Sequence, residues 1–378
     1  MSYLDKLLDG VEVEWKPLSH AENGVAVLSR GRVMSKEYLA ENAGIYPVYS
    51  SQTAKNGEIG RIQTFDHDGE SITWTTDGAN AGTVFHRTGK FSITNVCGLI
   101  KIINANELNY KFLFYWLSIE AKKHVYSGMG NPKLMSNQMA KIQIPVPPLS
   151  IQNEIVRILD TFTELTAELT AELTARKKQY NYYCDQLLSF EEGEVVWKPL
   201  GLLAENLDSM RKPVTSGQRE VGDIPYYGAS GIVDYVKDYI FDGDFLLISE
   251  DGANLIARNT PIAFSISGKN WVNNHAHVLK FNTYTERRFV EYYLNSIDLT
   301  PYISGAAQPK LNQRNLNDIK IPVPSPEEQE RIVAVLDKFD TLTASISEGL
   351  PREIELRQKQ YEYYRDMLLT FPTDNLKA

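Results

Sequence analysis

Two glycine-rich segments, far apart in the sequence, end in the same types of residue. Residues 127–134 read SGMGNPKL and residues 304–311 read SGAAQPKL, so each places an amide, a proline and a lysine before a leucine. Glycine lets a backbone approach another molecule closely. Lysine can contact phosphate, and Asn or Gln can form paired hydrogen bonds with a base edge. The pattern therefore indicates either a nucleic-acid contact or a repeated structural turn, and the residues alone leave both open.

Residues of the same chemical types occur elsewhere in glycine-rich surroundings. The string Asp-Gly-Ala-Asn is found at 77–80 and again at 251–254, and an Asp-Gly pair is typical of a turn. The candidate DNA-contacting residues, chosen by type and by neighbouring glycines, are Lys55, Arg61, Asn80, Asn131, Lys133, Asn137, Asn254, Arg258, Gln308, Lys310, Gln313 and Arg314.

Signatures of catalysis and of cofactor binding are missing from the sequence. The nearest match to an amino-methyltransferase motif, residues 131–133, lacks the second proline and the aromatic residue, and the Gly-Lys pair at 89–90 lacks the upstream glycine of a phosphate-binding loop. His275 and His277 would share one face of a strand, but no Cys or further His lies nearby in the sequence to complete a metal site. We therefore predict no catalytic residue, no metal site and no cofactor in this chain.

The element that must position the glycine-rich segments is a long stretch, residues 150–190. Apolar side chains recur there at steps of three and four, and neither Gly nor Pro interrupts the run, as is typical of one amphipathic helix. A second copy follows residues 321–324 (IPVP), as the first follows residues 144–147 (IPVP). Because Gly349 and Pro351 fall inside the second copy, we expect a break or kink there.

The ends of the chain indicate that this repeat is cyclic. Residues 3–8 (YLDKLL) match the helix endings at 183–188 (YCDQLL) and 364–369 (YRDMLL), and residues 15–18 (WKPL) recur at 197–200. The start of the chain therefore corresponds to the tail of a helix whose body lies at the other terminus. Antiparallel packing of the two long helices would bring the termini together and produce a pseudo-two-fold molecule.

Two globular segments lie between the helices, at about 15–145 and 197–322. Each contains short β-branched and aromatic runs and then a short aromatic helix, at 110–118 and at 287–295. We expect an α+β fold in which two similar mixed α/β globular domains are joined by two long helices that form an antiparallel coiled coil. The predicted boundaries are 1–148 for the first domain, 149–190 for the first helix, 191–324 for the second domain, and 325–378 for the second helix with the C-terminal tail.

Charge and composition restrict the possible functions. The chain has 378 residues, 43% hydrophobic content and a net charge of −9. Residues 1–148 carry 15 basic and 14 acidic side chains, whereas residues 191–324 carry 13 and 17. Phosphate contacts need Lys and Arg, so a DNA-binding protein of this composition must rely on local patches and on basic partner subunits.

The cysteine content and the lack of long apolar runs favour a cytoplasmic protein. Cys97 and Cys184 are the two cysteines, and their wide spacing argues against a zinc site and for a reducing compartment. No apolar run approaches the roughly 18 residues of a membrane span, and residues 1–5 do not resemble a signal peptide. We therefore expect no contact with a membrane.

The paired IPVP-helix units, the cyclic repeat and a tetrapeptide repeat together resemble the specificity subunits of type I restriction-modification systems. The resemblance covers essentially the whole chain. It is greatest to the IC group, whose first spacer helix carries Thr-Ala-Glu-Leu repeats, here at 166–169 and 170–173. The resemblance implies two target-recognition domains, each reading one half of a bipartite site in double-stranded DNA. It also implies that the helices set the spacer between the half-sites.

The resemblance further implies partner proteins and the cofactors that those partners use. Two methyltransferase subunits would dock on the helices, motor-nuclease subunits would join through them, and S-adenosylmethionine, ATP and Mg would be used by these partners. The residues that we assign to partner docking, on the exposed flanks of the helices, are Arg176, Lys177, Lys178, Tyr180, Tyr182, Tyr183, Tyr361, Tyr363 and Tyr364. The alternative is a coiled-coil protein-interaction scaffold without DNA readout. The divergence of the two globular segments, against closely similar helices, favours DNA recognition.

Overall fold

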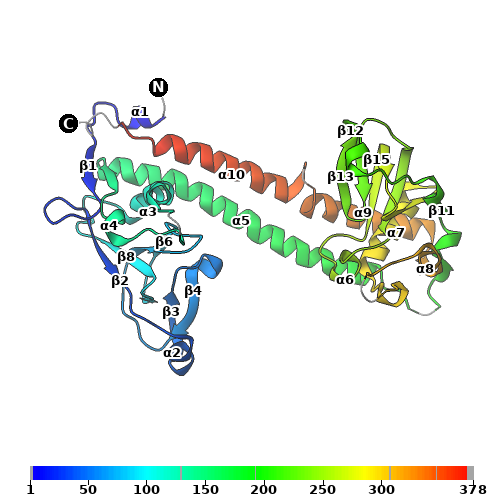
Figure 1. The fold of residues 1–378 in the computed structure, drawn as a ribbon, viewed down its shortest axis with the longest axis horizontal. Coiled ribbons are helices and arrows are strands. Elements are labelled where there is room, and N and C mark those ends of the chain that lie inside the picture. Colours follow the sequence, from blue (N-terminus) through cyan, green and yellow to red (C-terminus); the bar gives the residue numbers. More distant parts are fainter. Residues whose placement is uncertain (1–2, 128–129, 192, 306–307, 346, 373–378) are drawn as a thin grey trace. The chain divides into compact units, whose positions relative to one another are not determined.

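The computed structural model describes residues 3–127, 130–191, 193–305, 308–345 and 347–372. The chain divides into two compact units (Figure 1): unit 1 comprises residues 1–168 and 355–378, and unit 2 comprises residues 169–354. The longest helix, α5 (Leu149–Leu187), contributes to both units. Within the described ranges, no helix is long and apolar enough to cross a membrane.

Unit 1 contains a four-stranded sheet of order β2-β8-β5-β6, a three-stranded sheet of order β4-β3-β7, and the pair β1-β9. Helix α3 packs on β5 and β6. The elements, besides the first part of α5 and the end of α10 (Gly349–Leu368), are α1 (Tyr3–Leu7), β1 (Glu14–Pro17), β2 (Ala26–Arg30), α2 (Lys36–Glu41), β3 (Ala43–Tyr49), η1 (Ala54–Gly57), β4 (Glu58–Ile62), β5 (Ser71–Thr75), β6 (Val84–Arg87), β7 (Ser92–Ile93), β8 (Cys97–Ile102), α3 (Tyr110–Glu120), η2 (Ala121–His124), α4 (Ser136–Met139) and β9 (Gln143–Val146).

Unit 2 contains a six-stranded sheet of order β11-β16-β14-β15-β12-β13 and the pair β10-β17. Helix α7 packs on β14, β15 and α9. The elements, besides the second part of α5 and the start of α10, are β10 (Val196–Pro199), η3 (Leu200–Leu202), β11 (Glu205–Asn206), η4 (Asp208–Met210), η5 (Ser216–Gln218), β12 (Val221–Gly228), β13 (Gly231–Val236), β14 (Phe241–Ser249), α6 (Asn254–Ala257), β15 (Ala263–Val272), β16 (Ala276–Lys280), α7 (Tyr284–Ser296), η6 (Thr300–Tyr302), α8 (Gln313–Asp318), β17 (Lys320–Val323) and α9 (Pro326–Thr343).

The two short motifs that the sequence repeats pair with one another in each unit. In unit 1 the WKP strand β1 runs antiparallel to the IPV strand β9, with Trp15 opposite Pro145. In unit 2 the strand β10 pairs with β17 in the same register, with Trp197 opposite Pro322. Each pair joins the beginning of a globular segment to its end, immediately before a long helix begins.

The cyclic character of the repeat is visible in the core of unit 1. Leu368 and Leu369, at the end of α10, are buried in that core, and Phe371 meets the ring of Phe112 edge-on. In unit 2 the end of α5 has the corresponding role, because Phe190 packs on Phe289. The C-terminal end of the chain thus completes unit 1 as the end of α5 completes unit 2, which confirms the predicted cyclic repeat.

A matching Tyr–Asp hydrogen bond attaches the aromatic helix of each unit to a long helix. The Tyr115 hydroxyl of α3 donates to Asp160 of α5 over 2.6 Å. The Tyr292 hydroxyl of α7 donates to Asp337 of α9, also over 2.6 Å. Because the second long helix copy carries the same Asp at the same place, each globular segment is oriented on its helix by the same contact.

The second long helix is interrupted, as expected. Helix α9 ends at Thr343 and helix α10 begins at Gly349. Gly349 has a φ of +73°, and an added Cβ would lie 2.3 Å from the carbonyl oxygen of Thr341. The break therefore precedes Pro351 and depends on a glycine.

The α+β fold with two repeated mixed domains and long helices is confirmed. The second aromatic helix begins three residues earlier than predicted, at Tyr284.

Candidate nucleic-acid interface

In unit 1 the Asp-Gly-Ala-Asn turn lies against the end of the glycine-rich segment. Asp77 forms an isolated antiparallel bridge with Lys133, and the amide of Gly78 donates to the carbonyl oxygen of Pro132 over 3.0 Å. Gly78 has a φ of +87°, a left-handed conformation that favours glycine. The Asp-Gly pair thus forms the expected turn, and the turn supports the segment that carries Asn131.

Unit 2 repeats this arrangement. Asp251 bridges Lys310, and the amide of Gly252 donates to the carbonyl oxygen of Pro309 over 3.2 Å. Gly252 also has a left-handed φ, of +103°. Two motifs that the sequence analysis identified separately are therefore one structural unit in each copy. The tips of the two glycine-rich segments, residues 128–129 and 306–307, lie outside the described residues.

A buried leucine anchors the end of each segment. The amide of Leu134 donates to the carbonyl oxygen of Thr76 over 2.9 Å, and the amide of Leu311 donates to that of Glu250 over 2.7 Å. Neither leucine exposes any surface. The backbone just before each leucine is therefore fixed, while Lys133 and the corresponding lysine of unit 2 remain exposed.

The carbonyl oxygen of the anchoring leucine is also bonded, and in unit 1 the donor is a tryptophan. Trp74 is fully buried on β5, and its indole Nε1 donates to the carbonyl oxygen of Leu134 over 3.0 Å. Its ring covers Gly98 on the neighbouring strand, where an added Cβ would lie 2.2 Å from the ring atoms. A glycine is therefore required opposite this tryptophan.

In unit 2 the same strand positions hold different residues and the donor is a histidine. Ile248 on β14 lies opposite His277 on β16. The corresponding pair in unit 1 is Trp74 on β5 opposite Gly98 on β8. His277 is fully buried, and its Nε2 lies 2.7 Å from the carbonyl oxygen of Leu311. The two units thus bond the same backbone carbonyl from opposite strands of the pair.

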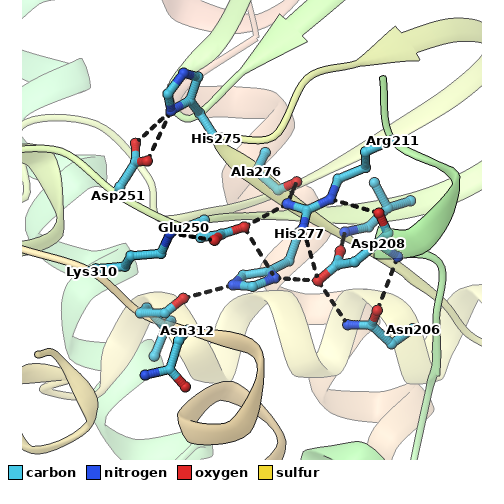
Figure 2. Close-up of polar contacts among 12 residues, drawn as sticks. Asn206, Asp208, Arg211, Glu250, Asp251, His275, Ala276, His277, Lys310 and Asn312 are labelled. Atoms are coloured by element: carbon cyan, nitrogen blue, oxygen red, sulfur yellow. Dashed lines mark hydrogen bonds and ion pairs between the residues drawn. The ribbon is translucent and has the colours of Figure 1, made fainter. Parts of the chain in front are cut away.

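Figure 2 shows that His277 belongs to a network of hydrogen bonds and ion pairs. Its Nδ1 lies 2.6 Å from Oδ2 of Asp208. Arg211 pairs with Asp208 over 3.4 Å and with Glu250 over 2.6 Å. Lys310 of the glycine-rich segment completes the series, with its Nζ 3.0 Å from Oε1 of Glu250. The lysine that borders the segment is thus connected through side chains to the histidine that holds its end.

The network lowers the pKa values of both of its carboxyl groups. Burial alone would raise the pKa of Asp208, but the hydrogen bond and charge of His277, the amide of Val278 and the charge of Arg211 outweigh burial and lower it. Burial would likewise raise the pKa of Glu250, and the hydrogen bonds from Arg211 and Lys310 lower it instead. Both groups are therefore carboxylates at neutral pH.

The structure corrects the expectation for the two histidines. His275 precedes β16, is exposed and contacts Asp251 over 2.8 Å, whereas His277 lies within β16 and is buried. Donor atoms of Asp208, Glu250 and His277 lie within 4.8 Å of one another, a grouping that could hold a metal ion and that sequence spacing did not indicate. Arg211 already pairs with both carboxylates, so a positive charge of the chain itself occupies this place.

Most of the predicted DNA-contacting residues are exposed at the two repeated surfaces. The following residues flank the anchored leucines or the turns and are exposed: Asn80, Asn131, Lys133 and Asn137 in unit 1, and Gln308, Lys310, Gln313 and Arg314 in unit 2. Asn137 lies in the short helix α4, and Gln313 and Arg314 begin α8. The structure therefore brings together residues that are scattered in the sequence.

Two further candidates of unit 1 lie on a neighbouring loop. Lys55 is exposed in η1, with a φ of +49°. Arg61 is exposed on β4, and its guanidinium pairs with Glu58, with Nε 2.8 Å from Oε1. The hydroxyl of Ser51 lies 3.4 Å from the amide of Thr76, which places the strand that leads to η1 beside the Asp-Gly turn.

Asn254 and Arg258 both form hydrogen bonds within the chain. The Asn254 side chain bonds both the amide and the carbonyl of Thr260, each over 3.0 Å. The Arg258 guanidinium donates to the carbonyl oxygen of Ile297 over 2.6 Å and also to that of Asn295. These hydrogen bonds stabilise the loop after α6, and a DNA contact by either residue stays a prediction.

The structure also separates the tyrosines that were assigned to partner docking. Four of them pack against the cores and are only partly exposed, contrary to the expected exposure on the helix flanks: Tyr180 and Tyr183 in unit 2, and Tyr361 and Tyr364 in unit 1. Tyr182 and Tyr363, by contrast, expose 61% and 66% of their surface. Among the basic residues, Lys177 and Lys178 are exposed, and Arg176 pairs with Glu172 over 3.3 Å.

Sequence reasoning missed several residues that support the surface of unit 1. Arg30 donates to the Ser136 hydroxyl over 3.2 Å, at the start of α4, and its guanidinium lies 6.0 Å from the ring centre of Trp74. The exposed Lys122 and Lys123 belong to η2, which leads into the glycine-rich segment. The Lys-Lys-His run was a charge signal that would have indicated them, whereas Arg30 had no local signal.

Comparison with known proteins identifies the same family in both halves of the chain. A family model described as "Type I restriction modification DNA specificity domain" matches residues 13–176 and again residues 195–356. The specificity subunit of the type I restriction enzyme EcoR124I/EcoR124II of Escherichia coli is 37% identical over an alignment of 415 positions, covering 98% of both chains. The EcoprrI specificity subunit, also from Escherichia coli, is 36% identical over 383 residues, covering 92% of both.

A solved structure has the same fold. The crystal structure of the type I restriction-modification S subunit from M. genitalium matches with a TM-score of 0.68 and 18% identity, covering 99% of this chain and 100% of that one. The double match of the family model follows the repeat that the structure shows in units 1 and 2. The chain therefore belongs to the family of type I restriction-modification DNA specificity subunits.

Proposed function

We propose that each unit reads one half of a bipartite site in double-stranded DNA through one repeated surface, which we call the reading face. In unit 1 the reading face comprises residues 77–80 and 130–137, and in unit 2 it comprises residues 251–254 and 308–314. The observation that supports the proposal is the contact between the Asp-Gly turn and the anchored end of the glycine-rich segment, which occurs in both units. A surface built twice in the same way suits a protein that makes the same kind of contact twice.

The exposed side chains of the reading faces have the chemistry that DNA recognition needs. The amides of Asn131 and Gln308 can donate to and accept from a base edge, as Asn and Gln do with adenine. Lys133 and Lys310 border these amides and can contact phosphate, which fixes the position of the protein on the duplex. Because Lys310 pairs with Glu250 at 3.0 Å, a phosphate at unit 2 would compete with a carboxylate.

The difference between the copies supports reading of two sequences rather than one. The turn, the proline and the anchoring leucine are repeated, whereas the amide changes from Asn131 to Gln308 and the residue before the turn changes from Thr76 to Glu250. Residues that hold the backbone should be shared between two reading faces, and residues that contact bases should differ. The family membership of the chain is consistent with this division.

We infer that the chain itself is not an enzyme and acts with partner subunits. S-adenosylmethionine, ATP and Mg would be used by two methyltransferase subunits and by motor-nuclease subunits that join through them. The exposed Tyr182 and Tyr363, on α5 and α10, are the strongest candidates for docking because large exposed aromatics favour a protein contact. The net charge of −9 supports the same inference, since phosphate binding then needs basic surfaces from the partners.

The Thr-Ala-Glu-Leu repeats are proposed to set the distance between the half-sites. Helix α5 runs without a break through both copies, residues 166–173. Four residues lengthen a helix by roughly 6 Å and rotate it by roughly 400°, a net turn of about 40° that is close to the roughly 35° of one base-pair step. Deleting residues 170–173 should shorten the non-specific spacer of the methylated motif and leave both half-sites unchanged. An unchanged spacer would contradict this role.

The experiment that tests the reading faces changes one of them at a time. Asn131→Ala combined with Lys133→Ala is compared with the matched pair Gln308→Ala and Lys310→Ala, each co-expressed with the partner subunits. Methylated motifs are then mapped by single-molecule sequencing of the host genome. Each pair should relax or abolish recognition of one half-site only, because a lost base contact costs about 1–3 kcal/mol. Loss of specificity in both halves, or in neither, would contradict the proposal.

A further inference from the structure

The loop between β3 and β4 of unit 1 is longer than the corresponding turn of unit 2. Tyr49 pairs with Glu58 across β3 and β4, so residues 50–57 form the β3–β4 loop. In unit 2 the corresponding strands β12 and β13 stay paired as far as Gly228 and Gly231, which leaves a turn of two residues. The β3–β4 loop is therefore an addition to the repeated fold, and it is present in one copy.

The backbone at the tip of this loop has an unusual conformation. Lys55, Asn56 and Gly57 have φ values of +49°, +54° and +83°, so three successive residues are left-handed. For residues other than glycine this conformation costs free energy, and in folded proteins it persists where surrounding contacts enforce it. The side chains of Lys55 and Asn56 are exposed. The loop thus presents two polar side chains on a strained backbone.

Arg87 on β6 supports this loop from the interior of unit 1. Arg87 is buried, and its Nη2 donates to the carbonyl oxygen of Asn56 over 2.6 Å, while its Nε donates to Oγ1 of Thr73 over 3.1 Å. An added Cβ at Gly57 would lie 3.2 Å from this Nη2, so the guanidinium packs directly against the loop. Both acceptors are neutral, whereas a buried charge is usually paired with an opposite charge. These hydrogen bonds therefore fix the loop and neutralise no carboxylate.

Unit 2 has an isoleucine at the position of this arginine. The strand pairs β5–β6 and β14–β15 correspond, and in their registers Ile266 takes the place of Arg87. Ile266 is buried in an apolar cluster. In unit 1 the guanidinium Cζ lies 3.6 Å from the ring centre of Tyr49 and 4.5 Å from that of Phe85, and aromatic rings attract a cation. The buried cation and the long loop thus occur in the same unit, and unit 2 has neither at the corresponding positions.

The start of the loop is fixed beside the reading face of unit 1. The Ser51 hydroxyl donates to the carbonyl oxygen of Val96 and accepts from the amide of Thr76, the residue immediately before the Asp-Gly turn. The side chain of Gln52 closes the loop by donating to the carbonyl oxygen of Glu58 over 2.7 Å. The β3–β4 loop therefore begins next to the turn of the reading face.

We propose that the β3–β4 loop is a second base-reading element of unit 1, in which Asn56 contacts a base edge of the first half-site, Lys55 contacts a neighbouring phosphate, and Arg87 is the positioning residue that holds both. An Asn side chain can both donate to and accept from adenine, and a lysine suits phosphate. Because the strained conformation is in place before DNA binds, little ordering of the loop opposes binding. The inference rests on the proposed function of the reading faces, and it concerns unit 1 alone.

The test measures how strongly the assembled complex discriminates at each half-site. The complex of full-length chain and methyltransferase subunits is titrated by fluorescence anisotropy with three duplexes: the mapped site, the site with the first half scrambled, and the site with the second half scrambled. The ratio of Kd values gives one discrimination factor per half-site. Asn56→Gly should lower the first factor by roughly tenfold, the size expected for one paired base contact, and leave the second unchanged. Its urea midpoint should not fall, because glycine adopts a left-handed conformation without strain.

A double-mutant cycle tests the positioning role of Arg87. Arg87→Met removes the donors to Asn56 and Thr73 and should also lower the first factor. Because Arg87 acts through Asn56, combining Arg87→Met with Asn56→Gly should lower the factor no further than Asn56→Gly alone. Additive losses would mean a general structural effect and would contradict the positioning role. The matched controls are Ile266→Met at the corresponding position of unit 2 and Asn106→Gly at an exposed turn of unit 1, and both should leave the first factor unchanged.

The outcomes separate this inference from the proposed function. If the wild-type complex discriminates at neither half-site, the reading faces themselves are wrong. If it discriminates at both and Asn56→Gly leaves the first factor unchanged, the inference is wrong, including the case in which all three duplexes bind equally more weakly and the contact is to phosphate. Loss of both factors, or loss of assembly with the methyltransferase subunits, would also contradict it. Should Arg87→Met fail to assemble, Asn56→Gly still decides whether the loop reads a base.

Discussion

Units 1 and 2 fix the same backbone carbonyl by different chemistry. In unit 1 a large side chain on β5, Trp74, reaches the carbonyl of Leu134 across a glycine. In unit 2 the donor is on the neighbouring strand, where His277 lies opposite Ile248 and reaches the carbonyl of Leu311. The comparison indicates that the position of the segment is the constrained feature, and that the side chain that holds it can change.

The contacts between each globular segment and its long helix, by contrast, use the same residue types in both units. Tyr115 and Tyr292 bond Asp160 and Asp337 with equal distances. The neighbouring cation varies only from Lys111, 2.6 Å from Asp160, to an arginine in unit 2. The attachment to the helix is thus preserved between copies, whereas the interior that supports the reading face has been replaced.

The largest effect should follow from removing the tryptophan anchor of unit 1. Trp74→Ala deletes a fully buried ring and the donor to Leu134, and should lower the free energy of unfolding by about 3–5 kcal/mol. The matched change in unit 2, Ile248→Val, removes one buried methylene and should cost about 0.5–1.5 kcal/mol. Urea unfolding followed by circular dichroism measures both. Similar losses for the two variants would mean that Trp74 is not the anchor of its unit.

A smaller effect should distinguish the two Tyr–Asp contacts. Asp337 accepts from Tyr292 and from Arg288, whose side chain is only 11% exposed and also pairs with Asp340. Asp337→Asn should therefore destabilise the chain by about 2 kcal/mol, since Arg288 then loses one of its carboxylate partners in a largely buried place.

Asp160→Asn is the matched variant in unit 1 and should cost about 1 kcal/mol or less. Its cation, Lys111, has a side chain that is 43% exposed, so water replaces much of the lost interaction. The same urea titrations provide the measurement. If Asp160→Asn were the more destabilising of the two, the exposure of the cation would not be what sets the strength of this contact.

The smallest effect concerns acid stability and should appear in unit 2. Asp208 and Glu250 have pKa values below their ordinary ones, so the folded chain binds protons at these groups less readily than the unfolded chain. Their stabilising contribution is complete above the ordinary values of about 3.9 and 4.3, and it is lost as pH falls through the lower folded-state values. Thr76 of unit 1 occupies the position of Glu250, so unit 1 should not show this loss of stability at low pH.

The variant Glu250→Gln tests the predicted loss of stability at low pH. This variant removes one of the two carboxylates that face Arg211, so it should be less stable than the wild type at pH 7. The difference between the two proteins should narrow as pH decreases below about 4, as measured by urea titration at a series of pH values. A difference that stayed constant down to pH 2.5 would show that Glu250 does not contribute through its charge.

The helical part of the fold could be predicted from the sequence because its motifs are repeated. The long helix, the break near Gly349, the cyclic repeat and the two aromatic helices all follow from motifs that occur more than once. The anchors of the reading faces were not predictable, because each unit uses a different residue and the partner lies 60 residues away for Trp74 and 34 for His277. The hydrogen bonds that Asn254 and Arg258 form in their loop were not predictable either, because residue type alone does not reveal them.

We propose that each unit reads its own half-site, and one exchange of segments tests this most directly. Residues 15–145 of unit 1 are replaced by the equivalent segment of a relative with a different target, leaving α5 and unit 2 unchanged. The methylated motif is then determined by single-molecule sequencing in cells that carry the partner subunits. We expect a new first half-site, an unchanged second half-site and an unchanged spacer. A motif that changes in both halves, or in neither while methylation persists, would contradict it.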